Sequence, residues 1–91
     1  MKNLSDFKKR LTVGANVETF NHNLSKSFGI RAIAEVNSNS FALNTQKDGE
    51  TVRSWCEYPK AKNFEIIDKD TALIYWGEGI RRTPILTYRF I

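Results

Sequence analysis

The residues best suited to recognition are aromatic and cationic side chains at the ends of two expected strands. They form two groups: Trp55, Tyr58, Lys60 and Lys62, and then Tyr75, Trp76, Arg81 and Arg82. Aromatic faces beside cations hold single-stranded nucleic acid by stacking and charge. The same residue types carry most of the binding energy in protein–protein interfaces. In the alternative interpretation, the tryptophans fill the core and the cations are solvated.

The segment from Gly77 to Pro84 is longer than the two to five residues that a hairpin connection requires. Ile80 is an apolar residue at its centre, where a solvated loop would be polar, and two arginines follow it. We predict a binding surface made of Ile80, Arg81, Arg82, Lys60, Lys62, Tyr58 and Trp76. The alternative is that Ile80 folds back onto the core while the arginines stay in solvent.

Catalytic chemistry has few candidates in this chain. The single histidine, His22, lies in a polar, Asn-rich segment, and the single cysteine, Cys56, alternates with Trp55 on an expected strand. A nucleophile needs a base and an orienting group within reach, and one Cys with one His cannot make a structural zinc site. Asp68 and Asp70 fit a solvated turn. We therefore predict a protein that is not an enzyme, with no catalytic residue, no metal and no cofactor.

The composition is that of one folded domain. The chain has 91 residues, of which 41% are hydrophobic and 26% charged, and this length fits one domain spanning 1–91. The net charge of +4 argues against an acidic DNA mimic and permits nucleic-acid binding without requiring it. The start of the chain lacks an apolar signal segment, and no apolar run reaches the ~18 residues of a membrane span. We predict a cytoplasmic protein with no membrane partner.

The position of the helix and the strands follows from hydrophobic spacing. Leu4, Phe7 and Leu11 lie on one face of a short helix over residues 4–11. From residue 16 to residue 91 the spacing changes to alternation, which is typical of strands. Asp48 and Gly49 indicate a type I′ hairpin, and a second hairpin is expected around residues 68–70.

These elements predict a mainly β (α+β) fold. We expect a small antiparallel sheet, either a partly open SH3-like barrel or a curled or flatter sheet, with the short N-terminal helix packed on it. An exposed edge strand in such a sheet would also permit a homodimer. Alternation and helical spacing predict the following buried residues: Phe7, Leu11, Val17, Ile30, Ala32, Ala34, Val36, Phe41, Leu43, Val52, Ile66 and Ile74.

Several short motifs resemble known proteins. Residues 11–17 (LTVGANV) resemble the opening of SH3-like barrels. Residues 36–45 (VNSNSFALNT), the Ser54-Trp55 pair and residues 58–61 (YPKA) resemble small uncharacterised proteins of Gram-positive bacteriophages and prophages.

This resemblance implies an accessory protein of phage type rather than a particular active site. Phage proteins of this size often bind and inhibit a host protein, including defence systems such as CRISPR nucleases. The resulting hypothesis is a non-enzymatic inhibitor that binds a host or phage protein in the host cytoplasm. The alternative is an SH3-like nucleic-acid-binding module.

Overall fold

One α-helix and seven antiparallel strands make up the fold, in a computed structural model that describes residues 1–91. The elements in chain order are α1 (Leu4–Arg10), β1 (Asn16–Asn21), β2 (Lys26–Val36), β3 (Ser40–Lys47), β4 (Glu50–Glu57), β5 (Phe64–Asp68), β6 (Thr71–Trp76) and β7 (Thr83–Phe90). Two 3₁₀ turns, Ala61–Asn63 and Gly79–Arg81, lie in the connections before β5 and β7. No helix has the length and apolar character of a membrane span.

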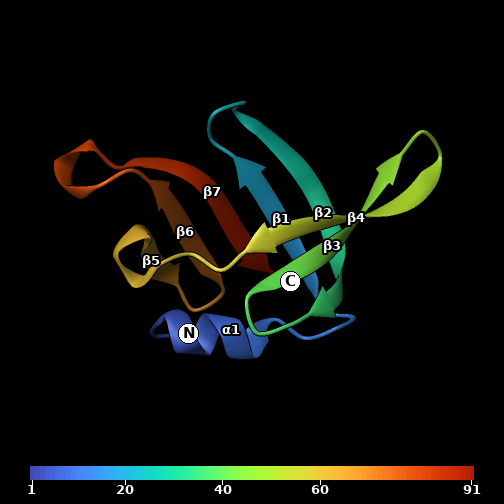
Figure 1. The fold of residues 1–91 in the computed structure, drawn as a ribbon, viewed down its shortest axis with the longest axis horizontal. Coiled ribbons are helices and arrows are strands. Elements are labelled where there is room, and N and C mark those ends of the chain that lie inside the picture. The colour runs from blue at the N-terminus through green and yellow to red at the C-terminus, as the bar shows by residue number, and fades with distance from the viewer.

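All seven strands belong to one curled sheet (Figure 1), in the order β4-β3-β2-β1-β7-β6-β5. The two ends of this order, β4 and β5, do not pair with each other, so the sheet is not closed into a barrel. The predicted mainly β fold with one short N-terminal helix is confirmed, and of the expected sheet forms the curled, open one is present.

The N-terminal helix forms where the sequence predicts it. The Asn3 side chain caps its first turn by accepting a hydrogen bond from the Asp6 N–H (2.9 Å), which satisfies a donor that the helix leaves free. The helix ends at Arg10, one residue before the expected end, and Leu11 follows as a buried cap residue. The helix lies across one open end of the curled sheet (Figure 1).

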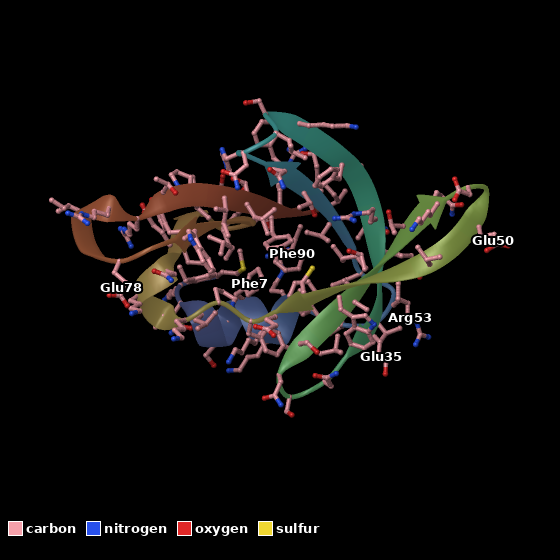
Figure 2. All side chains as sticks on the ribbon, turned by 45° about the horizontal axis from the view of Figure 1, so that its top comes forward. Phe7, Glu35, Glu50, Arg53, Glu78 and Phe90 are labelled. Atoms are coloured by element: carbon pink, nitrogen blue, oxygen red, sulfur yellow. The ribbon has the colours of Figure 1, made fainter.

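Phe7 holds this helix to the sheet. Its side chain is 0% exposed and lies at the centre of the molecule with Phe90 (Figure 2). Four aromatic rings from the sheet surround it, with centroid distances of 5.2 to 6.5 Å: Phe64, Phe90, Tyr88 and Phe41. A seven-residue helix is too short to persist by itself, so this aromatic contact is what fixes it.

The hairpin between β3 and β4 follows the predicted turn chemistry. Asp48 and Gly49 both have positive φ angles, 53° and 81°, as a type I′ turn requires. This two-residue turn sets Lys47 opposite Glu50, and the pairing then continues without interruption along both strands. The second expected hairpin is also present, with β5 ending at Asp68 and β6 starting at Thr71.

The predicted face of β2 is wrong. Ile30 was expected in the core and is 58% exposed, whereas Ile33 was expected on the other face and is 1% exposed. The pairing of β2 with β3 shifts between Ile33 and Glu35, and such a bulge interrupts strict alternation. Before this bulge, alternation holds: Arg31 lies opposite the buried Val17, and Ile33, two residues later, shares its concave face, so the error is in which face of the strand is buried.

The remaining core predictions divide into two groups. Those confirmed as buried are Phe7, Leu11, Val17, Phe41, Leu43 and Ile74, and those only half-buried are Ala32, Ala34, Val36, Val52 and Ile66. The core also contains residues that were not predicted: Thr19, Ala42, Thr71, Ala72, Tyr88 and Phe90. Tyr88 and Phe90 are buried because β7 is a central strand, between β1 and β6.

Candidate functional site

A groove of about 600 Å³ lies where the curled sheet stays open. One wall is the end of β4 and the chain after it, residues 55–60 with Lys62 and Asn63. The other wall comes from β6, β7 and the start of their connection: Ile74, Tyr75, Trp76, Gly77, Glu78, Ile85, Leu86 and Tyr88. In Figure 2 Glu78 lies toward one end of the molecule, next to the connection between β6 and β7, and Glu50, at the tip of the β3–β4 hairpin, lies at the other end.

The β4 strand presents unpaired main-chain groups along its outer edge. Tyr58 donates its N–H to the Asn39 carbonyl (3.3 Å), and residues that bond to the partner strand alternate along an antiparallel ladder. The main chain of Cys56 therefore faces β3, and that of Trp55 and Glu57 faces away from it. No group of this chain bonds to those outward N–H and C=O groups, because β4 pairs with β3 alone.

Both tryptophans lie at the surface of this groove and not in the core. Trp55 is 51% exposed on the β4 side, and Trp76 is 71% exposed on the β6 side. Ile80 is fully exposed in the 3₁₀ turn after β6. The alternatives in which the tryptophans fill the core, or Ile80 folds back onto it, are therefore wrong.

The structure brings Lys62 together with the loop after β6, as the predicted surface requires. Lys62 forms an ion pair with Glu78 (2.8 Å), and the hydrogen bond from Lys62, followed by its positive charge, lowers the pKa of that carboxyl. Arg82 donates to the Lys62 carbonyl (2.9 Å) and lies 4.1 Å from the centre of the Tyr75 ring. Lys62 and Arg82 therefore already have partners within the chain and hold the loop in place.

Lys60 and Arg81 differ from these two cations, because neither has an ion pair within the chain. Lys60 lines the groove, whereas Ile80, Arg81 and Arg82 lie outside its lining. The seven predicted residues thus divide into a groove set (Tyr58, Lys60, Lys62 and Trp76) and a neighbouring loop set (Ile80, Arg81 and Arg82).

Tyr58 mainly stabilises the wall of the groove through contacts within the chain. Its hydroxyl donates to the Asn37 carbonyl (2.8 Å), and its ring stacks on Phe41 with centroids 5.7 Å apart. The Lys8 ammonium lies 4.9 Å from the ring centre. Burial raises the pKa of the Tyr58 hydroxyl, so this group remains protonated and keeps its hydrogen bond.

The histidine, the cysteine and Asp70 have separate surroundings in the structure. His22 is half-buried, where its Nε2 atom makes a 2.6 Å hydrogen bond with the Thr87 hydroxyl, and it is not among the residues lining the groove. Cys56 is half-buried in the groove, and Asp70 is paired with Arg10 (3.1 Å). No three side chains of His, Cys, Asp or Glu come together as a metal-ligand set.

Comparison with known proteins gives no further assignment: no protein family, no curated protein and no solved structure matches this chain.

Apart from Trp76, the sequence prediction missed the far wall of the groove, and it did not identify β4 as the strand with the free edge. Ile74, Leu86 and Tyr88 look like ordinary strand residues, and only the strand order places them opposite β4. One local signal was available: Pro59 comes two residues after the end of β4 and stops the chain from returning in a tight hairpin, which would give that strand a second neighbour.

Proposed function

We propose that this protein is a non-catalytic binding module that takes an extended segment of a partner protein into the groove beside β4. The observation that supports this proposal is the unpaired edge of β4, where the main-chain groups of Trp55 and Glu57 face outward. An extended segment that adds as a further strand would satisfy these groups. The groove volume lies within the range of binding sites that enclose a ligand.

The groove also supplies anchoring side chains for such a segment. Trp55 and Trp76 stand on opposite walls, both largely exposed, and large aromatic side chains dominate the energetics of protein interfaces. Main-chain hydrogen bonds hold an added strand whatever its sequence, and the pockets between side chains select which residues it carries. The fully exposed Ile80, on the loop that continues from the groove, extends the contact surface.

The resemblance to phage and prophage proteins supports a narrower form of this proposal. In that form the partner is a host protein met in the host cytoplasm, and binding inhibits it. A defence protein such as a CRISPR nuclease is the partner class that the resemblance suggests.

A second candidate function is single-stranded nucleic-acid binding. The exposed Trp55 and Trp76 beside Lys60 and Arg81, which lack ion pairs, favour it, because stacking platforms beside free cations suit unpaired bases. Salt separates the two functions: single-stranded nucleic-acid affinity falls steeply with salt, by about 0.7 log unit per log unit of salt for each phosphate contact, whereas strand addition depends on salt much less.

The proposed function can be tested with peptides selected from a random library against the wild-type protein. Glu57→Pro removes the outward N–H at that position without removing a bond to β3, and Glu57→Ala is the matched control that keeps this N–H. We expect Glu57→Pro to lose peptide binding and Glu57→Ala to retain it. Urea denaturation of both variants verifies that each is folded.

Hydrogen exchange gives an independent measurement on the unchanged protein. The amides of Trp55 and Glu57 have no partner and should exchange rapidly in the free protein, then slowly when a selected peptide is bound. If the peptides bind equally well to folded Glu57→Pro, or leave these two amides unprotected, strand addition at β4 is wrong. If the library yields no peptide while a single-stranded oligonucleotide binds with a steep salt dependence, the second function replaces the first.

A further inference from the structure

The outer half of the β3–β4 hairpin extends beyond the rest of the sheet. The pairing of β2 with β3 ends at Leu43, so the residues of β3 after it have β4 as their only neighbouring strand. The hairpin projects from the molecule in Figure 1, and residues 46–51 are all exposed. A two-stranded ribbon is at best marginally stable in water. A further strand along the free edge of β4 would therefore stabilise this hairpin.

The same edge of β4 carries charges of both signs. Arg53 and Glu57 are exposed and separated by an even number of residues, so they lie on one face of the strand. Arg53 donates to Glu35 (2.6 Å) through one nitrogen, and its remaining N–H groups are available for a second acceptor. Glu57 has no ion pair within the chain, and neither has Glu50 at the hairpin tip or Lys60 after the strand.

We propose that two copies of this protein associate by pairing the free edges of their β4 strands antiparallel, with Trp55 on the twofold axis. In this register Arg53 lies opposite Glu57 of the second copy, and Glu50 comes near its Lys60. Because the pairing is symmetric, each pair of opposite charges occurs twice. The largely exposed Trp55 ring meets its counterpart at the axis. The dimer uses the same edge as the proposed function but does not depend on it.

Charge favours this register over the neighbouring ones. A shift by one residue sets outward main-chain groups against groups that already bond to β3, which breaks the ladder. A shift by two residues places Arg53 opposite Trp55 or Pro59 of the second copy, and a shift by four toward the hairpin tip places two Arg53 side chains opposite each other, which is unfavourable. Since one pair of edge strands makes a small interface, we expect the dimer to dissociate on dilution.

Analytical ultracentrifugation of the free protein at increasing concentration tests the dimer without any peptide. Arg53→Glu and Glu57→Arg each turn two attractive pairs into two repulsive ones, so each should weaken the dimer by about tenfold or more. Mixing these two variants should restore dimers, because one copy then presents two glutamates and the other two arginines. The double variant should dimerise by itself. Lys26→Glu is the matched control, since it reverses an exposed charge on β2 and should leave the dimer unchanged.

Hydrogen exchange locates the interface. The amides of Trp55 and Glu57 should exchange rapidly in dilute protein and more slowly as its concentration rises. Because Arg53→Glu also removes the exposed pair with Glu35, urea denaturation verifies that each variant is folded. The inference is overturned if the wild type stays monomeric at every concentration, if folded single variants dimerise as well as the wild type, or if their mixture gains nothing over either alone.

These outcomes are distinct from those that test peptide binding. A strictly monomeric protein that binds selected peptides beside β4 would overturn the dimer and leave the proposed function intact. A dimer with the expected charge dependence for which no peptide can be selected would overturn the proposed function and leave the dimer. If both are correct, a peptide bound beside β4 should shift the protein toward the monomer, because the peptide and the second copy compete for one edge.

Discussion

Replacing Phe7 by alanine should show how far the helix supports the sheet. Phe7 is completely buried and contacts four aromatic rings, and truncating a buried phenylalanine typically costs about 3–5 kcal/mol. A chain of this length has a free energy of unfolding of about 5–14 kcal/mol. Phe7→Ala should therefore remove a large part of it and lower the melting temperature by about 15–30 °C.

Far-UV circular dichroism during thermal and urea denaturation measures this change directly. Lys9→Ala is the control, because Lys9 is exposed on the same helix and has no hydrogen bond or ion pair from its side chain, so its effect should stay within about 0.5 kcal/mol. A Phe7→Ala loss below about 1 kcal/mol would refute the reasoning, since it would mean that the helix is not docked on the sheet. Because Phe7 contacts Phe41, on which Tyr58 stacks, a folded Phe7→Ala variant should also bind selected peptides less well.

Three further predictions concern single positions. Ile33→Ala should lower the free energy of unfolding by about 2–5 kcal/mol and Ile30→Ala by less than about 1 kcal/mol in urea denaturation, and the reverse order would contradict the burial of the Ile33 face of β2. Asn3→Ala removes the helix cap and should lower the free energy of unfolding by about 0.5–2 kcal/mol, so an unchanged value would argue against the cap. Hydrogen bonds from the Asp70 N–H and then from the Thr71 side chain lower the pKa of Asp68 below its ordinary value of 3.8. The negative charge of Asp68 therefore stabilises the fold at any pH above the unfolded-state pKa. This stabilisation is lost as the pH falls through the folded-state pKa. The difference between the wild type and Asp68→Asn should therefore shrink in urea titrations from neutral to acid pH, and a difference that grows would contradict this assignment.

Local features of this protein follow from the sequence because they depend on neighbouring residues. Asn3 caps a helix whose apolar residues repeat at helical spacing, and the Asp48–Gly49 pair forms a two-residue turn because both residues tolerate a positive φ angle. In β3 alternation correctly placed Phe41 and Leu43 in the core. The exposed, basic loop around Ile80 and its proximity to Lys62 were also predicted correctly.

The site itself depends on contacts between distant parts of the chain, which local patterns do not encode. Alternation along β2 places Ile30 and Ile33 on opposite faces but does not show which face is buried, because the pairing of β2 with β1 and β3 decides that. The free edge of β4 exists because β1 pairs with β7 across some 70 residues and leaves β4 at the end of the strand order. Spacing along one segment fixes which side chains share a face, but the pairing of all seven strands decides which face is buried and which edge stays open.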